Sequence, residues 1–127
     1  MLQRAMQLRQ ESEEAEQQLQ FIVHQIKELE KFGEDLEKLE KSKEKEMLTP
    51  LGRGVFAKME KKDEKLFVEV GAGVLVRKTN KETRTVIEGQ LRRFQEARMS
   101  LNQQLQNYAV EFQTMLKNVE KIKNKKS

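Results

Sequence analysis

Few residues in this sequence have the type and spacing that catalysis or metal binding requires. His24 is the only histidine and there is no cysteine, so these residues supply neither a histidine–cysteine metal site nor a nucleophile–base pair. Carboxylates are numerous, but Glu13, Glu14 and Glu16 fall on a solvated helical stretch with no pocket to tune them for acid–base work. We therefore predict a protein that is not an enzyme and that uses no metal or other cofactor.

Two glycine-containing segments are the remaining candidates for chemistry, because glycine-rich loops can bind phosphates. The segments Gly52-Arg53-Gly54 and Gly71-Ala72-Gly73 fit neither the P-loop spacing nor the dinucleotide-binding spacing. Each stands between two apolar runs, where glycine commonly marks a tight turn. We interpret both segments as turns.

The rest of the sequence must supply the elements that carry these turns, and most of it has a helical pattern. Apolar or small residues recur at steps of three and four, first at Met1, Ala5, Leu8, Ser12, Ala15, Leu19, Ile22, Ile26, Leu29, Gly33 and Leu36. The pattern returns at Ile87, Leu91, Phe94, Arg98, Leu101, Leu105, Tyr108, Phe112, Met115, Val119 and Ile122. This heptad spacing is typical of a coiled coil, with Thr79 or Asn80 as the cap of the second helix.

Between the two helical stretches the period changes to two, which indicates short strands. One face would collect Val55, Ala57, Met59, Leu66, Val68, Val70, Val74 and Val76, and the other Phe56, Phe67 and Leu75. A sheet this small cannot bury itself and leaves open edges. We therefore predict an oligomerisation site formed by Leu51, Val55, Phe56, Ala57, Phe67, Val68, Val70, Val74 and Val76.

These patterns together predict an α+β fold, a long antiparallel two-helix coiled-coil hairpin with a small β-meander (two β-hairpins) between the helices. We expect an N-terminal coiled-coil helix over 1–46, a β-hairpin oligomerisation region over 47–78, and a C-terminal coiled-coil helix with a basic tail over 79–127. If the hairpin is symmetric, Leu8 lies near Val119 and Leu36 near Leu91.

Composition agrees with an extended shape, since 36% of the residues are charged and only 6% are aromatic. The start of the sequence has no apolar run of signal-peptide length, and no stretch approaches the roughly 18 apolar residues of a membrane span. We expect a soluble cytoplasmic protein with no membrane partner.

The net charge of +4 is concentrated in residues 117–127, which hold five lysines and one glutamate. Such a tail can bind nucleic acid or an anionic membrane, or it can simply be a solvated helix end. No aromatic residue stands among these lysines to stack on bases, which argues against a nucleic-acid partner. We favour the helix end.

The middle of the sequence resembles the alpha class of prefoldin subunits. Leu48–Lys58 reads LTPLGRGVFAK and Val68–Thr79 reads VEVGAGVLVRKT, similar to the family's PLGxGxF and VxVGxGxxVEK strand motifs. Arg77 is a departure, because the family often has an acidic residue near this position. The resemblance implies a hetero-hexamer of two alpha and four beta subunits, in which the strands join into a central platform. It also implies coiled-coil tips that hold unfolded polypeptides without ATP and deliver them to a group II chaperonin.

On this reading the tips bind clients through Met1, Leu2, Met6, Leu8, Met115, Leu116, Val119 and Ile122. Leu2, Met6 and Leu116 fall outside the strict heptad seam, so we expect them to be exposed. Phe21 and Val110 also fall off the seam, at a similar expected height, and could form a second patch. The alternative function is a prefoldin-like scaffold or filament-forming assembly protein without client transfer.

Overall fold

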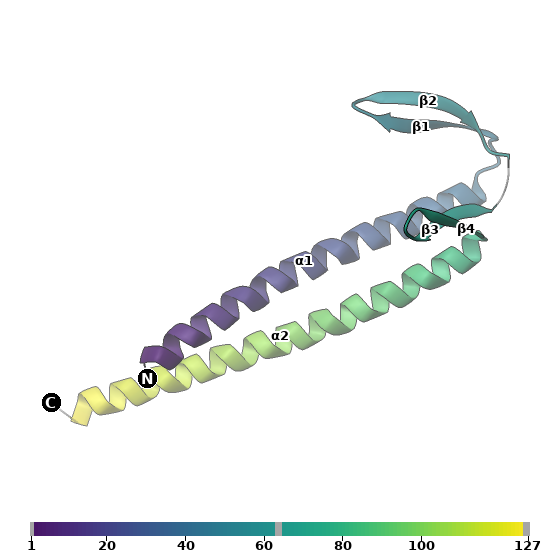
Figure 1. Ribbon diagram of the computed structural model, residues 1–127. Helices are drawn as coiled ribbons and strands as arrows, with labels where there is room; N and C mark the ends of the chain where they lie inside the picture. Colours follow the sequence, from purple (N-terminus) through teal and green to yellow (C-terminus); the bar gives the residue numbers. More distant parts are fainter. Residues whose placement is uncertain (1, 63–64, 126–127) are drawn as a thin grey trace. The chain divides into compact units, whose positions relative to one another are not determined.

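The computed structural model describes residues 2–62 and 65–125. Its elements follow the order α1 (Leu2–Lys41), β1 (Glu46–Gly52), β2 (Val55–Glu60), β3 (Leu66–Gly71), β4 (Val74–Lys78) and α2 (Asn80–Lys125) (Figure 1). The helix α1 ends before the expected limit at 46, inside a charged run that has no apolar residue to bury. Two long helices packed together, with two β-hairpins between them, confirm the predicted α+β fold.

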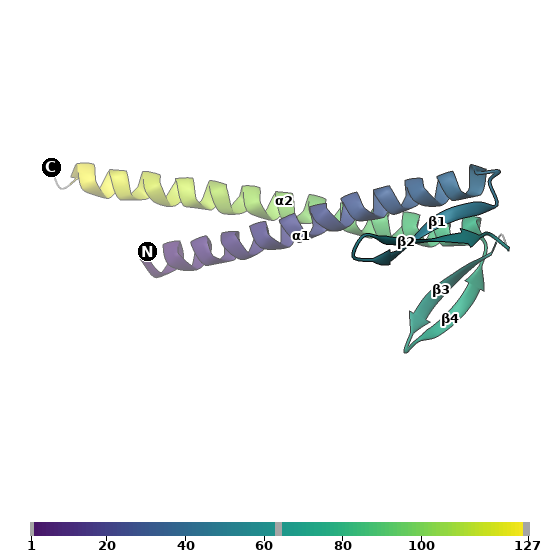
Figure 2. The same ribbon diagram turned by 90° about the horizontal axis from the view of Figure 1, so that it is seen from above.

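The chain divides into two units, and each is described by itself. The first, here called the coil unit, holds the residues up to Lys27 and those from Arg92 onward. The second, here called the hairpin unit, runs from Glu28 to Leu91 and holds all four strands. Figures 1 and 2 both show α1 and α2 side by side within the coil unit, with the last turns of α2 extending beyond the start of α1.

The core of the coil unit is a single apolar seam. Leu8, Ala15, Ile26 and Leu101 are buried in it, and all four belong to the predicted heptad series. Outside the seam, polar side chains pair along one helix, as in the Arg9–Glu13 ion pair. Burial of the seam stabilises the helix pair, because each fully buried leucine or isoleucine contributes about 1.5–3 kcal/mol.

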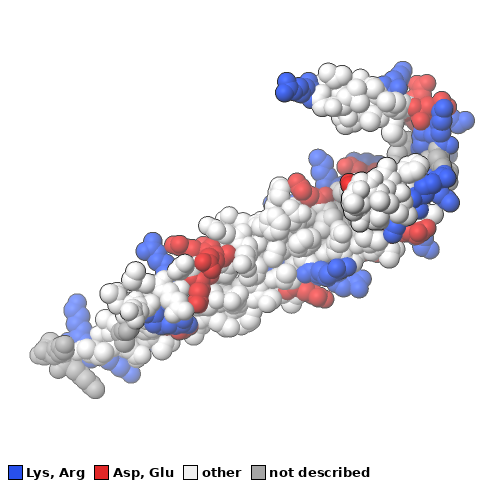
Figure 3. Space-filling model, viewed as in Figure 1, with Lys and Arg blue, Asp and Glu red and all other residues white. Residues whose placement is uncertain are grey.

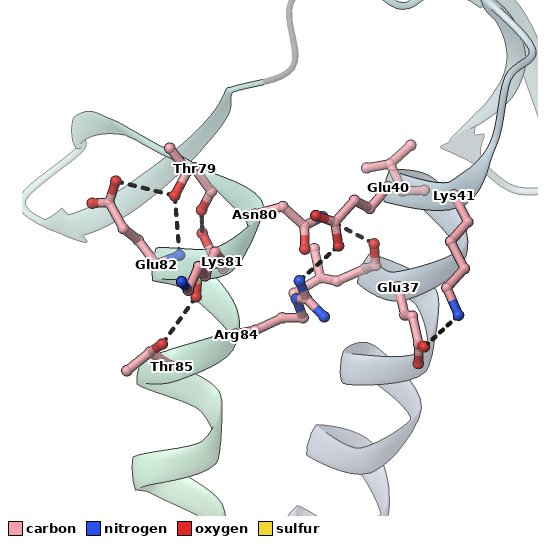
Figure 4. A network of polar contacts seen from close by, with 12 residues as sticks. Glu37, Glu40, Lys41, Thr79, Asn80, Lys81, Glu82, Arg84 and Thr85 are labelled. Carbon is pink, nitrogen blue, oxygen red and sulfur yellow. Dashed lines mark hydrogen bonds and ion pairs between the residues drawn. The ribbon is translucent and has the colours of Figure 1, made fainter.

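In the hairpin unit the helix ends are joined by polar contacts around the start of α2 (Figure 4). The Thr79 hydroxyl accepts a hydrogen bond from the Glu82 backbone N–H at 3.1 Å and donates one to the Glu82 carboxylate at 3.0 Å. Thr79 is therefore the helix cap. The amide of Asn80, which is buried, donates to the Leu36 carbonyl at 2.9 Å. Arg84 pairs with Glu40 at 2.7 Å.

The pairing register of the helices differs from the symmetric expectation. In the hairpin unit Leu36 contacts Asn80 and not the region of Leu91. In the coil unit Ala5, Leu8 and Ser12 line one groove with Leu105, Tyr108 and Phe112, and the predicted neighbour Val119 is not part of it. Both displacements amount to about three helical turns, or roughly 16 Å along the axis. The expectation assumed a hairpin symmetric about the middle of the chain, whereas α2 has 46 residues and α1 has 40, so the two helices are not related by that symmetry.

The strands form two separate two-stranded sheets, which are the two predicted β-hairpins. β1 pairs with β2 and β3 with β4, each pair antiparallel, and no ladder among the described residues joins the two. In the second hairpin Val68 and Val76, which were predicted for one face, are directly paired, and in the first hairpin Thr49 pairs with Ala57. The sequence analysis did not assign the proline-containing strand β1. Pro50 is tolerated there because β1 is an edge strand.

The two glycine segments are turns, as interpreted from the sequence. Arg53 and Gly54 have φ of 53° and 78°, and Ala72 and Gly73 have φ of 51° and 76°. Two consecutive residues with positive φ are the geometry of the hairpin turns that match strand twist. Just before each turn the register shifts, which leaves Leu51 without a partner residue in the first hairpin and Val70 in the second.

Candidate functional site

At the end of the coil unit where α1 begins, a two-pronged ion pair joins the helices. Arg4 Nε donates to Glu111 Oε1 at 2.7 Å, and a second guanidinium nitrogen donates to Glu111 Oε2 at 2.9 Å. The hydrogen bond to Arg4 lowers the pKa of Glu111, and the same bond raises the pKa of Arg4. Glu11 adds a longer contact to Arg4 at 3.8 Å. This pair fixes the register between α1 and α2 near the start of α1.

Beyond this pair α2 continues past the first described turn of α1. Leu116, Val119 and Ile122 lie on these last turns and are 51%, 45% and 50% exposed. Val119 and Ile122 belong to the predicted seam, and that placement is corrected here. They are exposed because the shifted register leaves them no described residue of α1 to pack against.

The other predicted client-binding residues divide between surface and seam. Leu2 and Met6 are 77% and 66% exposed, as expected from their off-seam positions. Leu8 is the most completely buried side chain, and Met115 is half-buried. Met1 lies outside the described residues. We call the exposed group of Leu2, Met6, Leu116, Val119 and Ile122 the coil end.

Phe21 and Val110 are both exposed, but they do not form one patch. Val110 is adjacent to Glu111, whose partner on α1 is Arg4. Phe21 therefore lies roughly 25 Å further along α1, at 1.5 Å per residue. The two residues lie at one height only in the symmetric register.

The second apolar surface belongs to the two hairpins. Of the predicted oligomerisation residues, Leu51, Val55, Phe56, Phe67, Val70, Val74 and Val76 are exposed, and Ala57 and Val68 are half-buried. Leu48 and Leu75 are equally exposed and were not in the predicted set. We call these eleven side chains the hairpin surface. Two-stranded hairpins are at best marginally stable alone, and contiguous exposed apolar side chains are a common feature of association sites.

Arg77, the departure from the family motif, has a local role on the β3–β4 hairpin. Its guanidinium lies over the Phe67 ring, 5.7 Å from the centroid. Phe67 and Arg77 are directly paired across the hairpin. Arg77 thus makes a cation–π contact on one face of this hairpin.

Sequence reasoning missed several exposed or paired residues. Met99 and Phe32 are exposed away from the seam, and only a helical-wheel count of off-seam apolar residues could have found them. The Arg4–Glu111 pair depends on the register between the helices, which no local pattern reveals.

Within residues 2–62 and 65–125, no group of three or more His, Cys, Asp or Glu side chains is placed to hold a metal ion. Over the same residues, neither helix has a stretch long and apolar enough to span a membrane.

A coiled-coil hairpin that carries two exposed β-hairpins at one pair of helix ends defines a subunit built to associate with others. The prefoldin subunit family matches residues 8–125. The chain belongs to the prefoldin family, as an alpha-type subunit, which confirms the predicted resemblance. Prefoldins are non-enzymatic chaperones that assemble with other subunits, so the chain belongs with the chaperones and not with the enzymes.

Among solved structures, the chain is similar to filamentous PFD from Methanocaldococcus jannaschii, determined by cryo-EM. The likeness has a TM-score of 0.78 and 18% sequence identity, and it covers 93% of this chain and 99% of that chain. At this identity the likeness establishes the shared fold. No curated protein matches the sequence.

Proposed function

We propose that this chain is a subunit of an ATP-independent holdase chaperone. The coil end of the subunit holds unfolded polypeptides, and the complex delivers them to a group II chaperonin in the cytoplasm. The coil end is the observation that supports this proposal. Leu2, Met6 and Leu116 are more than half exposed there, and flexible leucine and methionine side chains suit contacts with many different apolar partners.

We further propose that the hairpin surface joins this chain to beta-class subunits in a hetero-hexamer of two alpha and four beta subunits. The exposed apolar side chains of both hairpins support association, because open strand edges readily pair with further strands. Each sheet has two strands among the described residues, so both of its strands are edge strands.

The proposal is tested by light scattering of a chemically unfolded model protein, diluted into buffer without ATP. The assay contains the complex of this chain with a prefoldin beta subunit, its assembly verified by sizing. We expect suppressed aggregation, followed by transfer of the held protein to an added group II chaperonin. Normal aggregation in the presence of the assembled complex would overturn the holdase proposal.

A variant set locates the activity. Leu2→Ser, Met6→Ser and Leu116→Ser together should weaken suppression while assembly remains intact. Met99→Ser is the matched control, because Met99 is 73% exposed on the same unit but lies away from the coil end. Equal suppression by the triple variant and the control would exclude the coil end as the client site.

A filament or scaffold role is the second candidate. It is favoured by the likeness to a PFD that is described as filamentous, and by two hairpins whose apolar side chains are exposed. Electron microscopy of the chain alone, over a range of concentrations, separates the two roles. Filaments without any suppression of aggregation would select the second.

A further inference from the structure

The last turns of α2 combine an apolar stripe with unpaired positive charge. Leu116, Val119 and Ile122 are spaced by three residues, so they share one helical face. All three are about half exposed. Lys117, Lys121 and Lys123 lie on the same turns and are exposed, with Glu120 as the one acidic residue between them.

Two arginines of the coil unit, unlike these lysines, are held in ion pairs. Arg4 is held by Glu111 and Arg9 by Glu13. Among the described residues, no ion pair involves Lys117, Lys121 or Lys123. Figure 3 shows blue side chains around the end of α2, beside apolar and polar surface. Their charges are therefore available to a partner.

The helix dipole does not account for all three lysines. Its negative end acts within the last turn of a helix, and α2 ends at Lys125. Lys117 lies two turns earlier. Lys123 follows Val119 by four residues, so its positive charge lies on the same helical face as the apolar stripe.

We infer that the coil end selects unfolded segments in which apolar residues are flanked by aspartate or glutamate. This inference rests on the proposed holdase function and names the class of client that its site takes. The stripe of Leu116, Val119 and Ile122 contacts the apolar residues of such a segment. Lys117, Lys121 and Lys123 pair with its carboxylates and speed its encounter with the site. A phosphate backbone offers no apolar counterpart to the stripe, so an acidic polypeptide fits this surface better than a nucleic acid does.

The test compares two fluorescent peptides with the same apolar core, one flanked by aspartates and the other by lysines, bound to the assembled complex with beta subunits. Anisotropy titrations at low salt should show about three- to tenfold tighter binding of the acidic peptide, the size expected for a few exposed charge pairs. The preference should shrink at high salt, because exposed charges are screened.

Substitution of Lys117→Gln, Lys121→Gln and Lys123→Gln should abolish the preference and leave binding of a third peptide, flanked by glutamines, unchanged. Arg92→Gln, Arg93→Gln and Arg98→Gln form the matched control. They remove the same charge from exposed positions of the same unit, and the preference should persist.

Several results would overturn the inference. Equal affinities for both charged peptides would do so while leaving the holdase proposal intact, provided that the complex still suppresses aggregation. If the arginine control also loses the preference for the acidic peptide, the preference follows from the net charge of the chain and not from the position of the three lysines. If the lysine variant instead loses binding to vesicles containing phosphatidylserine, or to DNA, and the wild-type complex shows no peptide preference, the surface serves that other partner. Failure to bind any peptide or to suppress aggregation would refute the holdase proposal itself.

Discussion

Leu8 and Val119 give the sharpest test of the observed register. Leu8 is 1% exposed, whereas Val119 is 45% exposed. Leu→Ala in a well-packed core costs about 2–5 kcal/mol in unfolding free energy, from lost transfer energy and the remaining cavity. A two-helix layer can partly collapse around the gap, so we expect about 2–3 kcal/mol for Leu8→Ala. Val119→Ala should change stability by no more than about 0.5 kcal/mol.

The measurement is urea unfolding of the assembled complex, followed by helical circular dichroism. Leu116→Ala is the matched control for Leu8→Ala, because the chemical change is the same and Leu116 is 51% exposed. It should be nearly neutral to stability. The slope of the unfolding free energy against urea concentration should be the same for all variants, so that their unfolding midpoints can be compared.

A large loss of stability in Val119→Ala, comparable to that of Leu8→Ala, would refute the register. It would mean that these two side chains pack together, as a symmetric hairpin requires. The sequence has no cysteine, so paired cysteines offer a second check. With a short bifunctional thiol reagent, which bridges more than a disulfide does, cross-linking should be efficient between Leu8→Cys and Tyr108→Cys, which line one groove. It should be much weaker between Leu8→Cys and Val119→Cys, whose sites lie roughly 16 Å apart along the axis.

Three further predictions concern single contacts. The bond to Arg4 lowers the pKa of Glu111, so it stabilises the coil at pH values above the ordinary carboxyl pKa of 4.5, and this stabilisation is lost as pH falls through the lowered pKa. Glu111→Gln should therefore make coil stability less dependent on acid pH. An unchanged pH profile of stability would contradict the pairing. Thr79→Ala should cost about 1 kcal/mol in thermal unfolding, while Thr79→Ser keeps the cap. Gly71→Ala should cost about 1–3 kcal/mol and reduce assembly measured by sizing, since φ is 134° there. Gly89→Ala, in a helix with open space around the added Cβ, should be neutral or stabilising.

Local chemistry explains why the elements could be predicted. The heptad series marks Leu8, Ile26 and Leu101 as buried, and they are buried, because a three–four spacing places side chains on one helical face whatever the partner is. The glycine turns follow for a similar reason. Positive φ at Gly54 and Gly73 is favourable without a side chain, so the residue type alone indicates the turn.

The strand β1 escaped prediction for an equally physical reason. Its sequence carries Pro50, which cannot donate to a ladder. Only the pairing with β2, in which β1 is an edge, shows that no donor is required on the open side of Pro50. The apolar pattern of the strands also suited one sheet as well as two, because alternation describes a strand's faces and not its neighbours.

The sequence by itself determined which residues form helices, which faces of those helices are apolar, and where the chain turns. The tertiary structure alone decided how far one helix is displaced along the other. A displacement of three turns returns each residue to nearly the same face, so the apolar pattern is satisfied in either register. The long-range bonds from Arg4 to Glu111 and from Asn80 to Leu36 select one of them. That choice leaves Val119 and Ile122 exposed at the coil end.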